Sequence, residues 1–237
     1  MKTSAHIAST YEAAYAGGES EWRRIGAIEK ANNIIALCRG CRIESVVEIG
    51  AGEGSVIERL ASLNFAKSFH ACEISQAAVH TIKGRSIDRL ADCVLFDGYR
   101  TPFDDKRFDL AIMTHVIEHV EHPRVLLYEA MRVARLVFVE VPLEHTVRLP
   151  RDFRFTHIGH INFYTETTIR ALLQSCGLRI IGQKTTNSSK GTHSFHKSAT
   201  GSAKYYIKAA GLALAPSLAK ALFVYNSSLL CESRNSV

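Results

Sequence analysis

The sequence lacks any apolar run that approaches the roughly 20 residues of a membrane-spanning helix. The best candidate, residues 209–219, contains Pro216 and is flanked by Lys208 and Lys220. The first ten residues, MKTSAHIAST, also lack the apolar core of a signal peptide. These absences predict a soluble cytoplasmic protein.

The sequence also lacks a second Cys-x-x-Cys pair and any dense run of basic residues. Cys38 and Cys41 have the spacing of redox and zinc sites, but no second pair accompanies them, and the other four cysteines are scattered. We therefore expect no disulfide. The formal net charge of +6 is spread along the chain without interleaved aromatic residues. This distribution favours an ordinary solvated surface over a nucleic-acid-binding one.

What is present fits a single α/β domain. The chain has 237 residues, of which 46% are hydrophobic, enough for a full core. A helical pattern covers about residues 19–37, and strand-like runs then alternate with helical segments at 45–49, 68–73, 93–96, 108–114 and 136–141. Further strands are expected at 179–184 and near the end of the chain, with a helix-like segment near 203–220 between them. A helix is also expected over 169–176, behind a Thr165 cap. This alternation predicts a parallel sheet with helices on both faces.

The glycine-rich segment VVEIGAGEGSV (46–56) lies between the first strand and a helix. It departs from the dinucleotide fingerprint, because Ser55 stands where the last small residue should be. Glu48 and Glu53 flank the turn and would repel a pyrophosphate, whereas a positively charged ligand would be attracted. The turn therefore points away from NAD and ATP.

Two acidic residues end the next strands. Glu73 follows strand two and Asp97 follows strand three. Ligands of open α/β sheets bind outside the carboxyl ends of the strands, where a carboxylate can accept hydrogen bonds from two ribose hydroxyls. Asp97 is suited to accept a hydrogen bond from an adenine amino group. Together the two acids predict a nucleoside-containing ligand.

Four segments in this order and spacing resemble the class I S-adenosylmethionine-dependent methyltransferases, especially the small-molecule branch with Glu-His after strand four. They are VVEIGAGEGSV, ACEIS, FDGYRTPFDDKRFDLAIMTHVIEHVEHP and HINFYTETTIRALLQSCGL. The similarity spans about residues 11–184. It implies a Rossmann-like, seven-stranded, mostly parallel sheet with helices on both faces and an antiparallel last strand.

The resemblance also implies a cofactor and its contacts. The cofactor would be S-adenosylmethionine, with S-adenosylhomocysteine as the product, and its sulfonium and ammonium suit the acidic glycine turn. The residues expected to contact it are Glu48, Gly50, Ala51 and Gly52 at the methionine end, Glu73 and Ile74 at the ribose, Asp97 and Gly98 at the adenine, Tyr11 from an N-terminal flap, and His115 beside the reacting methyl.

The expected organisation is one methyltransferase domain over residues 1–237. It consists of an N-terminal helical flap (1–40) with Tyr15 and Trp22, a cofactor-binding core (41–186), a lid insertion (187–220), and the last strand and tail (221–237). The apolar stripe of 203–220 predicts a wall over a small, partly planar or apolar acceptor.

The reaction would be an in-line displacement on the sulfonium methyl by an oxygen, nitrogen or carbon nucleophile. Histidine is the natural base near neutral pH, and the candidates are His115, His119, His157 and His160. His157 and His160 can equally be parts of a structural loop. The segment HVIEH (115–119) also matches a zinc-protease pattern, but its place after a buried strand argues against a hydrolase, and we expect no metal.

Two other functions stay open at this point. One is a non-catalytic S-adenosylmethionine-binding module that acts with a partner, because intact binding residues do not establish turnover. The other is a nucleic-acid methyltransferase, although the Asn/Asp-Pro-Pro-aromatic run of base-methylating relatives is missing after strand four. The identity of the acceptor and the oligomeric state, including a homodimer, are open.

Overall fold

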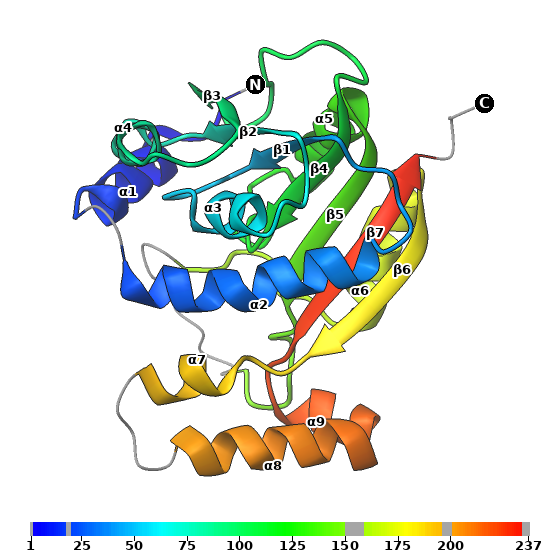
Figure 1. Cartoon of the computed structure of the whole chain (residues 1–237). Helices are drawn as coiled ribbons and strands as arrows, with labels where there is room; N and C mark the ends of the chain where they lie inside the picture. Colours follow the sequence, from blue (N-terminus) through cyan, green and yellow to red (C-terminus); the bar gives the residue numbers. More distant parts are fainter. Residues whose placement is uncertain (1, 18–19, 150–158, 196–200, 234–237) are drawn as a thin grey trace.

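A seven-stranded sheet with the strand order β3-β2-β1-β4-β5-β7-β6 forms the centre of the molecule (Figure 1). The computed structural model describes residues 2–17, 20–149, 159–195 and 201–233. The strands are β1 (Ser45–Ile49), β2 (Ser68–Glu73), β3 (Leu90–Leu95), β4 (Phe108–Thr114), β5 (Ala134–Pro142), β6 (Leu178–Thr186) and β7 (Asn226–Ser233). The first five are mutually parallel, and β7 runs antiparallel to both β5 and β6. The predicted Rossmann-like sheet, with its antiparallel last strand, is confirmed.

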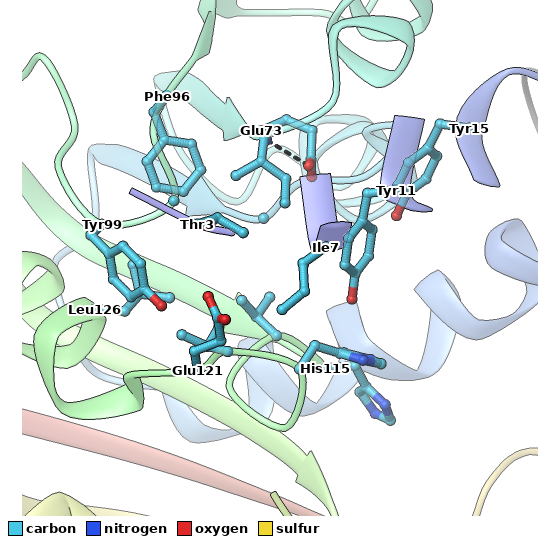
Figure 2. Close-up of a pocket in the computed structure, with 16 residues that line it drawn as sticks. Thr3, Ile7, Tyr11, Tyr15, Glu73, Phe96, Tyr99, His115, Glu121 and Leu126 are labelled. Carbon is cyan, nitrogen blue, oxygen red and sulfur yellow. Dashed lines mark hydrogen bonds between the residues drawn. The ribbon is translucent and has the colours of Figure 1, made fainter. Parts of the chain in front are cut away.

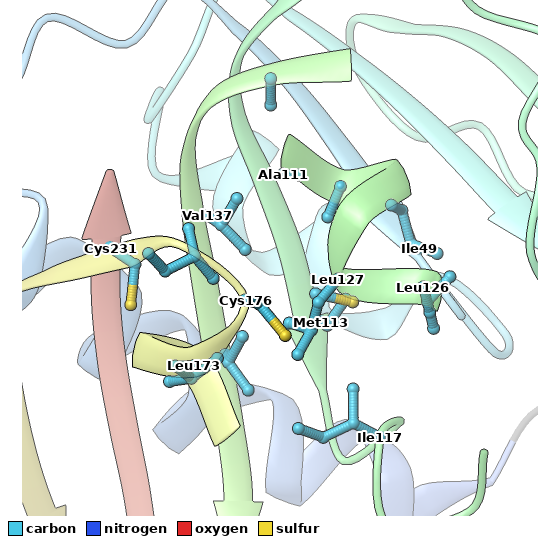
Figure 3. Packing of buried hydrophobic residues seen from close by; sticks show 14 of the residues in the cluster. Ile49, Ala111, Met113, Ile117, Leu126, Leu127, Val137, Leu173, Cys176 and Cys231 are labelled. Atoms are coloured by element: carbon cyan, nitrogen blue, oxygen red, sulfur yellow. The ribbon is translucent and has the colours of Figure 1, made fainter. Parts of the chain in front are cut away.

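Helices pack on both faces of this sheet, as predicted. They are α2 (Glu21–Leu37), α3 (Ser55–Ser62) and α4 (Gln76–Gly84) on one face, and α5 (Pro123–Val133) and α6 (Glu166–Ser175) on the other. Strand residues alternate between the two cores, so that Val46 packs against α2 and α3 while Val47 faces α5. Figure 3 shows the α5–α6 core, in which Leu127 and Leu173 pack against the sheet. Strands buried on both faces explain the continuous apolar runs in the sequence.

The N-terminal residues form a separate helix, α1 (Ala5–Tyr15), which the sequence analysis places only within a general flap. None of its residues is buried. Figure 1 shows α1 beside α4, at the side of the sheet where β1 and β2 lie. Its Glu12 carboxylate accepts hydrogen bonds from Ser75 Oγ (2.8 Å) and the Ala77 amide (3.0 Å) at the start of α4. α1 therefore contributes no buried residue to the core, and hydrogen bonds such as those of Glu12 help to hold it in place.

The segment between β6 and β7 contains three helices, α7 (Lys190–Phe195), α8 (Gly201–Leu214) and α9 (Pro216–Leu222). The single helix expected over 203–220 is broken because Pro216 has no amide hydrogen to continue it, and Pro216 begins α9 instead. These helices lie beyond the carboxyl end of β5, where β7 begins (Figure 1). Within the described part of the chain, no helix has the length and hydropathy needed to cross a membrane.

Candidate functional site

The glycine turn after β1 needs glycine for both backbone and spatial reasons. Gly50, Gly52 and Gly54 all have positive φ, at 78°, 58° and 81°. A Cβ at Gly50 would lie 2.7 Å from a methyl of Val116, and one at Gly52 would lie 2.8 Å from the Tyr15 hydroxyl. The amides of Gly50 and Ala51 donate to the Cys72 carbonyl, which ties the turn to β2. The predicted strand-to-helix turn is thus present and leaves little space around its backbone.

A cavity of about 80 Å³ lies beside this turn (Figure 2). Six predicted cofactor contacts line it: Tyr11, Gly50, Glu73, Ile74, Gly98 and His115. Figure 2 shows Thr3, Ile7 and Tyr11 of the N-terminal segment lying across the cavity, between Glu73 and the Glu121–His115 side. The cavity therefore combines the ends of four strands, β1 to β4, with a cover made by α1 and the residues before it.

Glu73 is a buried carboxyl with a fixed orientation. It accepts hydrogen bonds from the amides of Gly52 (2.8 Å), Ile74 (2.7 Å) and Ser75 (3.3 Å). Burial raises the pKa of Glu73, although these amides oppose the shift. A carboxylate has about four acceptor positions, so one remains for a ligand hydroxyl. The geometry is compatible with the predicted ribose contact, which stays a prediction.

Asp97 and Gly98 have different positions relative to the cavity. Asp97 does not line it, and its Oδ1 accepts hydrogen bonds from the amides of Tyr99 (2.8 Å) and Arg100 (2.7 Å). Gly98 does line it, and a Cβ there would collide with Thr3. Asp97 thus shapes the turn that exposes Gly98, and only its Oδ2 remains for the predicted adenine contact.

A second, larger cavity of about 460 Å³ adjoins the first. Five residues line both cavities, Tyr11, Tyr15, Gly50, His115 and His119. The remaining predicted methionine-end residues, Glu48, Ala51 and Gly52, line the larger one. The predicted cofactor contacts are therefore divided between two cavities that share a wall.

Glu48 is the least compensated acid of the glycine turn. It is 1% exposed, Thr114 Oγ1 contacts its Oε1 at 3.5 Å, and its Oε2 has no hydrogen-bond partner. Burial raises the pKa of Glu48 to about 8, against the opposing charge of Lys30. A cationic ligand group in this cavity would favour the ionised form.

Glu53, the other acid beside the turn, is satisfied within the protein. Its carboxylate accepts hydrogen bonds from Arg23 (3.0 Å), the Ser20 amide (2.9 Å) and Ser55 Oγ (2.9 Å). Arg23 also lies over the Tyr15 ring at 4.4 Å. Glu53 therefore joins α2 to the turn, and attraction of a cationic ligand stays a prediction for Glu48 alone.

His115 follows β4 in a strained conformation, with a φ of 57°. Its Nδ1 lies 3.5 Å from a Glu118 oxygen, and its Nε2 lies 3.5 Å from a Glu140 oxygen. The sequence analysis misses Glu140, although a glutamate inside the buried run LVFVEVP is a detectable signal. Burial disfavours its charge, but the neighbouring His115 ring and a hydrogen bond from Ser228 outweigh burial and lower the pKa of Glu140 to about 2.

The other three histidine candidates are not equally placed. His119 and His160 come together, with ring centroids 4.5 Å apart, and both line the larger cavity. His157 lies outside the described residues. The HVIEH segment forms a turn after β4, whereas the zinc-protease pattern needs a helix to bring its two histidines together. The hydrolase alternative therefore lacks the helix that it requires over residues 115–119.

The predicted lid contributes less than expected. Ser188 and Thr192, at and before α7, line the larger cavity, but no residue of α8 or α9 does. Several apolar side chains of these helices face solvent, including Ile207 (59% exposed) and Leu214 (85% exposed). The apolar wall expected from 203–220 is therefore absent, because this stripe is not directed at the cavity. Trp22, which the sequence analysis assigns to the N-terminal flap, lines the larger cavity. The lid over residues 187–220 remains a prediction.

Comparisons with known proteins agree with this fold and site. A family model described as a methyltransferase domain matches residues 21–183, so the chain belongs to this family. The resemblance to class I methyltransferases is confirmed: the chain is an S-adenosylmethionine-dependent methyltransferase, and S-adenosylmethionine is its cofactor. The comparison with curated proteins gave no match.

Solved structures show the same fold at low sequence identity. One is a chain of the complex between the Haloferax volcanii Trm112 methyltransferase activator and a methyltransferase (TM-score 0.66, 14% identity, 94% of this chain and 96% of that chain). Another is magnesium protoporphyrin IX methyltransferase from Synechocystis with bound S-adenosylhomocysteine (0.59, 14%, 90% and 84%). A third is a cyclase (0.60, 16%, 86% and 80%). The fold alone therefore does not identify the acceptor.

Proposed function

We propose that the protein transfers the methyl group of S-adenosylmethionine to an oxygen, nitrogen or carbon nucleophile of a small molecule, which binds in the larger cavity. The observation that carries this proposal is the wall that the two cavities share at Gly50, His115 and His119. A donor bound along that wall presents its methyl to the larger cavity. The acceptor then approaches from the side of α2 and α7.

The donor site is argued from burial and charge. The adenosine occupies the smaller cavity, where Glu73 offers its free acceptor position and Gly98 gives close access to the backbone. The methionine end crosses the glycine turn toward Glu48, whose Oε2 has no partner in the protein. A ligand ammonium or sulfonium there compensates the Glu48 charge that burial disfavours.

The residues of the chain orient the reactants and handle the proton. S-adenosylmethionine supplies an activated methyl, so alignment and exclusion of water provide most of the acceleration. Tyr11 and Tyr15 cover the shared wall, with ring centroids 6.4 Å apart. His115 is held between Glu118 and Glu140 and is the base that we propose for a protonated nucleophile. The ionised Glu140 stabilises the imidazolium that forms.

A small acceptor is supported by the shape and lining of the larger cavity. Its polar residues include Arg23, Glu29, Lys30, Ser188 and Asn226, which suit a polar compound of limited size. The Synechocystis relative acts on magnesium protoporphyrin IX, a small molecule, within the same fold. A nucleic-acid acceptor is less favoured because the positive charge forms no continuous run in the sequence. A cytoplasmic location, one domain over residues 1–237 and a lid at 187–220 complete the proposal.

Two measurements test this function. Calorimetry is expected to show binding of S-adenosylhomocysteine in the micromolar range, about −8 kcal/mol, with NAD and ATP far weaker. Incubation with S-adenosylmethionine and fractionated cell metabolites is expected to produce S-adenosylhomocysteine, and mass spectrometry then identifies the methylated compound. Tight donor binding without turnover in any fraction would favour the non-catalytic module. Preferential NAD binding would contradict the donor site itself.

A further inference from the structure

Three potential metal ligands from two segments converge beside the shared wall. Glu118 and His119 belong to the turn after β4, and His160 precedes α6. Their ligand atoms all lie within 4.8 Å of one another, and no other group of three histidine, cysteine or acidic residues within the described ranges meets the same criterion. The convergence depends on the fold, because about 40 residues separate the two segments in the sequence.

The backbone holds the two segments together independently of these side chains. The amides of Ile161 and Asn162 both donate to the Glu118 carbonyl at 2.9 Å. The Asn162 side chain donates to the carbonyls of Ile117 (3.1 Å) and Val120 (2.8 Å). His160 is therefore fixed next to the turn by hydrogen bonds to its neighbours, and the site is organised before any ligand binds.

Glu118 is a buried carboxyl without a hydrogen-bond partner. It is 0% exposed, and neither of its oxygens accepts a hydrogen bond from the residues that the structure describes. His115 Nδ1 lies 3.5 Å from its Oε1. Buried polar groups in proteins almost always have partners, so an unsatisfied carboxyl pointing at two histidines indicates a missing ligand.

Both histidines have the outer partners that metal-binding histidines commonly have. His160 Nδ1 is hydrogen-bonded to the Glu144 carboxylate, which leaves Nε2 for an ion. A ring nitrogen of His119 is hydrogen-bonded to the backbone of Gly159. Carboxylate or carbonyl partners of this kind fix the ring orientation and leave the second nitrogen free to coordinate.

We propose that Glu118, His119 and His160 bind a divalent transition-metal ion. Two imidazoles and one carboxylate suit zinc, iron(II), cobalt(II) and related ions better than magnesium or calcium, which prefer oxygen ligands. Ligands at about 2.1 Å from one ion lie about 3.4 Å apart in tetrahedral geometry, so small side-chain rotations close the site. Three protein ligands leave at least one position open toward the larger cavity, which His119 and His160 line.

This site differs from the zinc-protease pattern considered for the sequence. That pattern pairs His115 with His119, whereas the structure directs His115 toward Glu118 and Glu140 and pairs His119 with His160. The sequence-based expectation of no metal came from the isolated Cys38–Cys41 pair and from the place of the protease pattern after a buried strand. Neither pattern includes His160.

A bound ion would define the class of acceptor, a step that rests on the proposed function. The open position would take an oxygen of the acceptor, and a hydroxyl bound there loses its proton more readily. The proton passes to His115 or to water, and an oxygen lone pair forms the new bond to the methyl carbon. The methyl–sulfur bond breaks, its electron pair stays on sulfur, and neutral S-adenosylhomocysteine leaves. Acceptors would then be compounds with an ionisable hydroxyl.

The test measures metal binding directly, without donor or acceptor. The protein is treated with a chelator, dialysed, and titrated with Co²⁺ and Zn²⁺ by absorption and calorimetry, with Mg²⁺ as a comparison. We expect one Co²⁺ per chain, ligand-field absorption bands, displacement by Zn²⁺ and no comparable Mg²⁺ binding. Glu118→Gln and His160→Asn are each expected to weaken Co²⁺ binding at least tenfold. His145→Asn, at an exposed histidine beside Glu144, is the matched control and should bind as the wild type does.

The outcomes separate this site from the proposed function. Absence of stoichiometric Co²⁺ or Zn²⁺ binding to the wild type would overturn the metal site and leave methyl transfer intact. Equal loss of affinity in His145→Asn would mean that surface histidines bind the ion, which also overturns it. S-adenosylhomocysteine affinity and far-ultraviolet circular dichroism verify that each variant folds. If a variant does not fold, the stoichiometry and absorption bands of the wild type still decide the question.

Discussion

The protonation of Glu48 links the glycine turn to the stability of the whole chain. Its folded pKa of about 8 lies well above its ordinary value of 4.5, because the side chain is buried. Between these two pH values the folded state holds a proton that the unfolded state has released. The stabilising contribution of Glu48 is therefore complete below pH 4.5 and is lost as the pH rises through 8.

Glu48→Gln should remove this pH dependence. Urea denaturation of both proteins without ligand, at pH 5.5, 6.5, 7.5 and 8.5, measures it. The variant should gain free energy of unfolding relative to the wild type as the pH rises, because it has no carboxyl to ionise. The difference should level off above pH 8. A constant difference over this range would show that Glu48 does not titrate as its burial indicates.

Glu73 is the residue whose loss should most directly weaken donor binding. Glu73→Gln removes the charge but keeps the size of the side chain, and it leaves ligand hydroxyls without a charged acceptor. We expect a ten- to hundredfold weaker affinity for S-adenosylhomocysteine, or about 1–3 kcal/mol, in calorimetry. Asp92→Asn, at an exposed acid on the neighbouring strand β3, is the matched control. An unchanged affinity in Glu73→Gln would remove Glu73 from the donor site.

Sequence spacing identified the acids at strand ends but not their hydrogen bonds. Glu48, Glu53 and Asp97 look alike as acids near strand ends. The structure engages Glu53 with Arg23 and Asp97 with the amides of its own turn, and it leaves Glu48 open. Glu140 was missed because its importance comes from His115 and Ser228, which lie far from it in the sequence. Partners from distant segments decide the role of each carboxyl.

At the level of elements, we expect α1 to act as a cover that opens at low cost. Thr3, Ile7, Tyr11 and Tyr15 line the cofactor cavity, yet α1 has no buried residue and is attached by hydrogen bonds such as those of Glu12. Segments with few buried apolar contacts open most readily. The strand ends therefore form a buried side of the cavity, and α1 forms the side that we expect to open.

Removing residues 1–16 should make the donor site exchange its ligand faster. We expect dissociation of S-adenosylhomocysteine to accelerate at least tenfold and association to accelerate as well, because the cover no longer has to open. Trp22, the single tryptophan, lines the larger cavity and can report binding by stopped-flow fluorescence. Circular dichroism verifies the fold of the shortened chain. Unchanged rates in both directions would show that α1 does not control access.

The elements themselves were largely predictable, and the exceptions have physical reasons. The Thr165 cap of α6 was expected from the sequence and is present, with its side chain accepting from the Thr168 amide at 3.1 Å. The helix over 203–220 was expected as one unit, because its apolar stripe continues across Pro216. Its direction relative to the cavity depends on long-range packing, such as Tyr225 Oη donating to the Lys208 carbonyl. The spacing of apolar residues in the sequence does not reveal the direction in which these helices face.

For the whole molecule, ligand binding should appear as a large thermal shift. A ligand at about 100 times its dissociation constant stabilises the folded state by about 2.7 kcal/mol. For a chain of this size, each kcal/mol raises the melting temperature by about 2–4 °C. We expect S-adenosylhomocysteine to raise it by about 5–10 °C in calorimetric scans, and NAD at the same concentration to raise it by less than 1 °C. An equal shift with both ligands would mean that the binding is not specific.

The sheet order also has a consequence for the synthesis of the protein on the ribosome. β7 lies between β5 and β6, so neither strand gains that neighbour until residues 226–233 exist. About 40 residues separate the end of β6 from the start of β7, or a few seconds of translation at 5–20 residues per second. During this interval the β5 edge and all of β6 present unpaired backbone groups to other nascent chains. Premature termination in the 187–225 region would make that exposure permanent and should produce fragments that aggregate or require chaperones.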